Sequence, residues 1–308
     1  MSESRVTGLL ARRAVLVGTA AAVAFKAGPS WAAGGTGLAD RLGNDAVPLA
    51  DADLLAALVR LRGSTDGRVT AGWLESSRYA VIDGEAWPLC RVLAGALSRF
   101  ERKRDDLYEA TILEITHYLD FATGELLDTL TMPVTGRVVK VPPYRIGPTP
   151  VRFAVRLDER ETFSPTQEGK GAGNFAPLGE VRLRRSVSDA RRSGDKLFLR
   201  HEEHGSLTPA SADVRPVTYR EWTIWSGPAD VALDPAAGYC PSDYSYTAMT
   251  SWRPWMQMGD VSGHTLDSGR GAKARRFEDL PQRYLELTER QHPDVIRDPV
   301  AALARRAG

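Results

Sequence analysis

Two segments of the sequence alternate as a β-strand does and place ionisable side chains among apolar ones. In residues 218–225, Tyr219, Glu221, Thr223 and Trp225 fall on one face. A carboxyl group buried beside aromatic walls has a raised pKa, because burial disfavours its charged form. We therefore expect Glu221 to be a proton donor or base, Tyr219 a second donor and Trp225 part of the wall. The alternative is a salt bridge from Glu221 to one of the chain's many arginines.

The second segment, residues 107–119, carries a histidine. His117 and Glu109 share the odd-numbered face with leucine and isoleucine residues. If this face points into a mostly apolar cavity, His117 is suited to general acid–base catalysis near neutral pH, and Glu109 to contacting a ligand. The alternative is a histidine that is hydrogen-bonded to a partner on a neighbouring strand.

The stretch SWRPWMQMGD, residues 251–260, concentrates two tryptophans and two methionines. Such side chains build adaptable apolar walls, which suit a bulky hydrophobic ligand but also fill protein cores. The stretch holds no catalytic group before Asp260. We expect it to contribute substrate-binding residues, with core packing as the alternative. The residues concerned are Trp252, Trp255, Met256 and Met258.

Other kinds of chemistry have no matching pattern. The nearest approach to a metal motif is HEEH, residues 201–204, whose histidines are three residues apart. A metal-binding helix of that kind needs a spacing of four. The sequence has no G-x-S-x-G motif, no dinucleotide-binding glycine pattern and no phosphate-binding loop. We expect neither a metal nor another cofactor.

The elements that would position these residues are mainly strands. Residues 51–61 predict one helix, since leucines recur along one face and Gly63 follows. From about residue 68 the pattern alternates, with hairpin turns expected at 83–84, near 123–124 and at 135–136. Residues 162–178 read as a long loop, and residues 277–291 return to a helical period.

Many consecutive hairpins favour an antiparallel meander that closes into a lipocalin-like barrel, because closure removes exposed strand edges. The predicted fold class is thus mainly β (α+β), with an N-terminal helix and C-terminal helices.

The N-terminus has the pattern of an export signal. Arg12 and Arg13 precede a short apolar run at residues 14–25, and small residues surround Ala32. This is typical of a cleaved secretory signal and is loosely similar to the twin-arginine type. We therefore expect a periplasmic or extracellular protein. The expected divisions are a signal peptide at 1–32, a linker at 33–49, a single barrel domain at 50–297 and a tail at 298–308.

Net charge, hydropathy and the two cysteines indicate which binding partners and which disulfide the chain could have. The chain has 308 residues and a formal net charge of +1, so no nucleic-acid partner is indicated. No segment after the signal is long and apolar enough to predict stable insertion into a membrane. Cys90 and Cys240 could form one disulfide or remain two free thiols, and spacing does not decide between them.

Four stretches resemble the domain of unknown function 1838 (DUF1838), a family of bacterial and fungal proteins. They are RLRGSTDGRVTAGWLESSRYAV from residue 60, EITHYLDFATGELLDTLTMPVTGRVVKV from residue 114, SWRPWMQMGD from residue 251 and FEDLPQRYLELTERQHPDVI from residue 277. The resemblance covers about residues 50–297. It implies one domain, with export signals common among members, and it implies no particular chemistry.

Three functions are consistent with these patterns. The favoured one is a cofactor-independent enzyme, such as an isomerase, lyase or cyclase, that binds a hydrophobic small molecule in an apolar cavity. A lipocalin-like carrier would use the same cavity without chemistry. An exported structural protein would have its barrel interior filled with side chains.

Overall fold

The computed structural model describes residues 45–46, 49–154, 162–163, 178–209 and 215–304. The expected signal peptide, most of the linker and most of the long loop at 162–178 lie outside these residues. No helix in the described ranges is long and apolar enough to cross a membrane.

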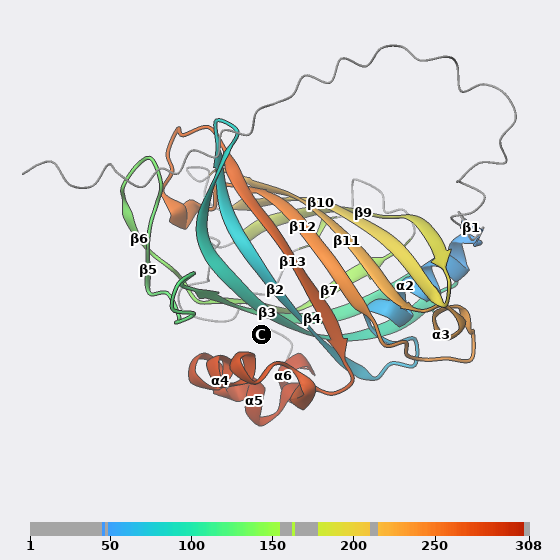
Figure 1. Cartoon of the computed structure of the whole chain (residues 1–308). Coiled ribbons are helices and arrows are strands. Elements are labelled where there is room, and N and C mark those ends of the chain that lie inside the picture. The colour runs from blue at the N-terminus through green and yellow to red at the C-terminus, as the bar shows by residue number, and fades with distance from the viewer. Residues whose placement is uncertain (1–44, 47–48, 155–161, 164–177, 210–214, 305–308) are drawn as a thin grey trace, which may run out of the picture. The chain divides into compact units, whose positions relative to one another are not determined.

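The fold is mainly β, as predicted, and is organised by one large antiparallel sheet (Figure 1). Its strands are β1 (Asp45–Ala46), β2 (Val69–Ile82), β3 (Glu85–Arg104), β4 (Leu107–Leu119), β7 (Tyr144–Phe153), β8 (Thr162–Phe163), β9 (Leu178–Ser193), β10 (Lys196–Pro209), β11 (Val217–Pro228), β12 (Asp243–Ser251) and β13 (His264–Ala274). A separate hairpin pairs β5 (Thr129–Thr131) with β6 (Val138–Lys140), as the third predicted turn implies.

The strand order makes the meander return on itself. Neighbouring strands follow the order β1-β9-β10-β11-β12-β13-β2-β3-β4-β7, so the last long strand, β13, pairs with the first, β2. The sheet is strongly curled (Figure 1). Among the described residues β7 and β9 do not pair, and the curled sheet has its break between these two strands.

Local sequence explains where the strands turn. Asp83 and Gly84 both have positive φ, at 52° and 80°, as a tight hairpin between β2 and β3 requires. The chain near Thr123 and Gly124 does not form the expected hairpin between two long strands. There β4 pairs with β3 and β7, and the segment after β4 makes one isolated bridge, Leu119 to Leu126.

Helices cover one end and one outer face of the sheet. They are α2 (Asp51–Arg62), α3 (Ala229–Leu233), α4 (Gln282–Gln291), α5 (Pro293–Arg297) and α6 (Pro299–Ala304), with short 3-10 turns η1 (Pro254–Met256) and η2 (Phe277–Asp279). Helix α2 confirms the predicted N-terminal helix. Acidic residues in its first turn and basic ones in its last suit the helix dipole. The folded chain continues past residue 297, because α6 buries Ala302 and Leu303.

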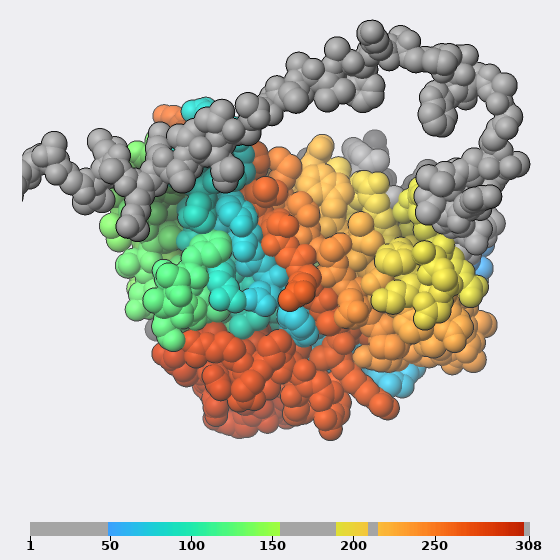
Figure 2. All heavy atoms as spheres, in the orientation of Figure 1, coloured from blue at the N-terminus to red at the C-terminus, as the bar shows by residue number. Residues whose placement is uncertain are grey.

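Three apolar clusters result from this arrangement. One surrounds α2 at one end of the curled sheet, and a second lies around Met256 and Met258. The third packs α4 to α6 against the outer face of β3 and β4. Figure 2 shows the C-terminal residues in red next to residues coloured cyan and green. Cys90 and Cys240 are both buried free thiols in different clusters.

Candidate functional site

A cavity of about 220 Å³ lies on the concave side of the sheet. Residues of β2, β3, β4, β10, β11, β12 and β13 face it, together with Tyr144 of β7, Arg62 from the end of α2 and Arg253 next to η1. Its volume is below the range of about 300–1,000 Å³ that is usual for drug-sized ligands. The cavity therefore suits a small molecule.

The lining is not the apolar wall that the sequence led us to expect. Apolar contributions such as Leu74, Val92 and Ile112 are interrupted by tyrosines, hydroxyl groups and charges. The ionisable lining residues are Arg62, Arg78, Tyr118, Glu114, Tyr144, His201, Glu203, Glu221, Tyr244, Tyr246, Asp267 and Lys273, with Arg253. Apolar clusters at the two ends leave this polar band between them.

Glu221 lies in this polar band, on the face of β11 that lines the cavity. Its neighbour across β10 and β11 is another carboxyl group, Glu203, in direct register. Burial, and then the charge of Glu203, raise the pKa of Glu221 to about 8. Glu221 can therefore hold or release a proton near neutral pH.

Two tyrosines hold these carboxyl groups in place. The Tyr246 hydroxyl donates to Oε1 of Glu221 at 2.9 Å, and the Tyr219 hydroxyl donates to Oε1 of Glu203 at 3.1 Å. Tyr219 is not among the cavity-lining residues described, and it contacts the cavity through Glu203. Its ring covers Gly205 so closely that a Cβ there would lie 2.3 Å from it. A glycine at position 205 is required for this packing.

A third carboxyl group, Glu114, enters from β4. Burial raises its pKa, and the charge of Arg253 and a 3.3 Å hydrogen bond from the Thr116 hydroxyl oppose the rise. Glu203 also repels a charge on Glu114. Three glutamates thus share one cavity, and Glu114 and Glu221 are both driven toward their neutral forms.

Opposite these acids, β2 and β13 contribute a buried ion pair. Arg78 Nε donates to Oδ1 of Asp267 at 2.9 Å and Nη2 donates to Oδ2 at 3.0 Å. Both side chains are less than 10% exposed. The planar, two-point geometry makes this an anchored charge pair in the wall of the cavity.

His117 is not in the cavity, and the sequence-based expectation was wrong about its face. The side chain points outward beneath α4. There Nδ1 lies 2.8 Å from Gln291 Oε1 and Nε2 lies 2.9 Å from Thr288 Oγ1. Burial lowers its pKa to about 4. The odd face of β4 packs against the C-terminal helices, so both faces of this strand are buried and alternation alone could not orient it.

Of the six residues predicted to bind the ligand, one lines the cavity and the other five are not among the lining residues described. Trp225 lines the cavity. Glu109 lies away from it, partly exposed and near Lys103 at 3.6 Å. Trp252, Trp255, Met256 and Met258 pack in an apolar cluster at the end of the sheet and are not among the cavity-lining residues described. The core alternative therefore holds for SWRPWMQMGD, and the residue it adds to the cavity is Arg253.

The HEEH stretch contributes in an unexpected way. His201 and Glu203, two apart on β10, both face the cavity, a role that the sequence pattern of this stretch did not indicate. Alternation along β10 was the signal that could have identified them. Within the described residues no group of three or more histidine, cysteine or acidic side chains could hold a metal ion.

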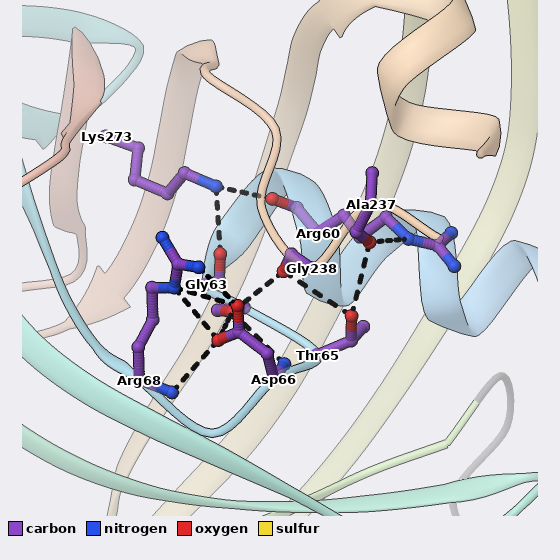
Figure 3. A network of polar contacts seen from close by, with 9 residues as sticks. Arg60, Gly63, Thr65, Asp66, Arg68, Ala237, Gly238 and Lys273 are labelled. Atoms are coloured by element: carbon purple, nitrogen blue, oxygen red, sulfur yellow. Dashed lines mark hydrogen bonds and ion pairs between the residues drawn. The ribbon is translucent and has the colours of Figure 1, made fainter. Parts of the chain in front are cut away.

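A separate polar network fixes the end of α2 beside the cavity (Figure 3). Lys273 Nζ donates to the carbonyl oxygens of Arg60 and Gly63, the latter at 2.9 Å. Arg60 Nε donates to Ala237 O at 2.8 Å. Burial lowers the pKa of Lys273 to about 7. Because its ammonium nitrogen contacts helix carbonyls, we assign Lys273 to anchoring α2.

Comparison with known proteins gives one match. A model of the family described as "Protein of unknown function (DUF1838)" matches residues 222–305. No curated protein matches the chain. The matched segment contains the SWRPWMQMGD and FEDLPQRYLELTERQHPDVI stretches, and it spans roughly a quarter of the chain. Over residues 222–305 this chain is similar to the DUF1838 family.

Proposed function

We propose that this chain is a cofactor-independent enzyme that moves a proton at a carbon atom of a small molecule, as an isomerase, lyase or cyclase does. The observation that carries the proposal is the group of three glutamate carboxyl groups facing one small cavity, with Glu221 held by the Tyr246 hydroxyl and Glu203 by the Tyr219 hydroxyl. The ligand in this proposal combines an apolar body with polar groups, in place of the hydrophobic molecule expected from sequence.

In the proposed reaction Glu221 takes a proton from carbon and returns it elsewhere on the substrate. A base is most effective when its pKa is near the working pH, and the pKa of Glu221 is about 8. The Tyr246 hydroxyl fixes Oε1 of Glu221 at 2.9 Å, so that the second oxygen can face the substrate. The charges of Glu203 and Glu114 contribute to this raised pKa, because each disfavours a further negative charge on Glu221.

Proton exchange in heavy water tests the proposal without knowledge of the natural substrate. We expect the protein to accelerate deuterium incorporation beside the carbonyl group of cyclohexanone or phenylpyruvate, followed by mass spectrometry. Glu221→Gln should lower the acceleration by about a hundredfold or more, because general acid–base groups contribute that much.

Glu109→Gln is the matched control, since Glu109 lies outside the cavity. It should exchange at the wild-type rate. If neither compound exchanges faster than in buffer, a lipocalin-like carrier becomes the better reading of the same cavity. If Glu221→Gln exchanges as fast as the wild type, the assignment of the base is wrong.

We also propose that the curled sheet closes into a lipocalin-like barrel. Side chains support this across the break between β7 and β9. Phe153 of β7 has its ring centroid 6.3 Å from that of His201 on β10. Phe153 also shares one buried cluster with Ala190 of β9 and Leu199 of β10.

Export through the twin-arginine route is a further proposal, supported by Arg12, Arg13 and the apolar run that follows. It places the protein in the periplasm or outside the cell. In a bacterial host, a reporter fused behind residues 1–40 should be exported. Changing both arginines to lysine should retain the reporter inside the cell, and unchanged export would contradict this route.

A further inference from the structure

Some buried polar groups that line the cavity have no hydrogen-bond partner within the described part of the chain. They include Ser76 Oγ, Arg78 Nη1 and Trp225 Nε1. Their residues are 4%, 5% and 7% exposed. Guanidinium and indole N–H groups can only donate, and a serine hydroxyl can also donate. Because unpaired buried donors are costly, the cavity is complementary to a ligand that accepts hydrogen bonds.

Two of these donors lie side by side. Ser76 and Arg78 are two residues apart on β2, so both point to the concave face, with their Cα atoms about 7 Å apart. Asp267 occupies Nε and Nη2 of Arg78, and Nη1 of this cavity-lining residue has no hydrogen-bond partner. This pair of donors forms the Ser76–Arg78 edge of the cavity.

Positively charged side chains elsewhere in the same cavity favour an anionic ligand. Arg62 and Arg253 also line the cavity, and both lower the pKa of Glu114 by their charge. Asp267 is the acid nearest to the edge, and its charge is compensated by Arg78 itself. Glu114 and Glu221 resist ionisation and so oppose an anion less than their number implies.

We propose that the ligand of this cavity is a small monocarboxylic acid whose carboxylate accepts hydrogen bonds from Ser76 Oγ and Arg78 Nη1. The proposal rests on the proposed function and names its substrate class. A carboxylate has the two acceptor oxygens that two adjacent donors require. Trp225 Nε1, on β11, is available to a second acceptor on the same molecule.

The strand register relates this anchor to the proposed base. Arg78 pairs with Asp267, Asp267 with Ala248, and Ala248 with Glu221, so the anchor and the base share one row across four strands. Ser76 lies in the adjacent row, which contains Tyr246. The acid would thus be held at β2 while Glu221 contacts carbon atoms from β11.

Binding of benzoate, compared with that of neutral benzamide of the same shape, tests the inference. We expect calorimetry at pH 7 to give at least tenfold tighter binding of benzoate. Ser76→Ala should weaken benzoate binding about tenfold and leave benzamide binding nearly unchanged, since a hydrogen bond to a charged group is lost. Trp225→Phe removes the third donor while keeping an aromatic wall.

Ser98→Ala is the matched control. Ser98 lines the same cavity, but its hydroxyl already lies 3.1 Å from Thr70 Oγ1, so benzoate binding should not change. For the arginine, a double variant, Arg78→Met with Asp267→Leu, removes both charges together and avoids leaving a buried aspartate unpaired. It should abolish the preference for benzoate while a thermal unfolding transition persists.

The inference is overturned if benzoate binds no tighter than benzamide, or if Ser76→Ala and Ser98→Ala have equal effects. It is also overturned if inorganic phosphate competes as strongly as benzoate, since the site would then accept any oxyanion. The outcome is independent of the exchange assay. If benzoate binds selectively but no proton exchange is seen, only the proposed function is contradicted. If exchange is seen without selective binding of benzoate, only the assignment of a carboxylic acid as the ligand is contradicted.

Discussion

Glu221 illustrates how a single residue acquires its chemistry from its neighbours. A lone carboxyl group on a strand would be ionised at neutral pH, but Glu221 is buried directly opposite Glu203. The two acids lie on adjacent strands because HEEH and TYREWTIW pair in antiparallel register. Sequence alternation predicted the face of Glu221. It could not predict Glu203 as the neighbour, because that depends on which residues face each other across strands.

The pH dependence of proton exchange follows from this environment. Glu221 is a base only when ionised, and its pKa is about 8. We therefore expect the exchange rate of the wild type to rise with pH and to level off above about pH 8. Glu221→Gln should show no such rise. A wild-type rate already constant from pH 6 upward would contradict this role.

At the scale of elements, β4 shows why part of the site was predicted wrongly. Its even-numbered residues, such as Glu114, face the cavity, and its odd-numbered ones, such as His117, face α4. Both faces of β4 are buried, one against the cavity and the other against the C-terminal helices, so neither face is purely apolar or purely polar. Helix α2 and the β2–β3 hairpin were predictable, since a one-sided apolar stripe and an Asp-Gly turn are local signals. Docking of α4 onto β4 is a long-range contact that no local pattern encodes.

Packing of α4 over β4 should depend on pH through His117. Its pKa is about 4 in the fold and 6.5 in an unfolded chain, so the unfolded state binds its proton first. Stability should therefore fall as pH decreases from about 6.5 toward 4, by at most about 3 kcal/mol from this group.

His117→Gln removes that titration and should flatten the dependence over the same interval, although it lowers stability at pH 7.5 through altered hydrogen bonds to α4. Urea unfolding between pH 7.5 and 4.5 measures both effects. An equal loss of stability in the wild type and in His117→Gln across this interval would show that the buried histidine does not titrate as argued.

At the scale of the whole molecule, the strand order brings the residues of the candidate site together. Glu114, Glu203, Glu221 and Asp267 come from strands spread over most of the chain, and they meet because the sheet curls and β13 pairs with β2. A meander was predictable from consecutive hairpins. The pairing of its first and last long strands depends on curvature and follows from no short motif. In β7, Pro148 and Pro150 lack backbone donors, which is typical of an edge strand. Side chains must therefore account for most of any contact across the break.

Phe153 is the residue on which the proposed closure of the sheet would depend most directly. It is 1% exposed, and its ring lies 5.2 Å from that of Phe100 and 6.3 Å from that of His201. We expect Phe153→Ala to lower the free energy of unfolding by about 3–5 kcal/mol. If Phe153 joins the two edges, hydrogen exchange should also accelerate in β10, which is far from β7 in the pairing order. Leu113→Ala, on the outer face of β4, is the control and should affect β3 and β4 instead. Unchanged protection of β10 in Phe153→Ala would mean that the sheet remains open between β7 and β9.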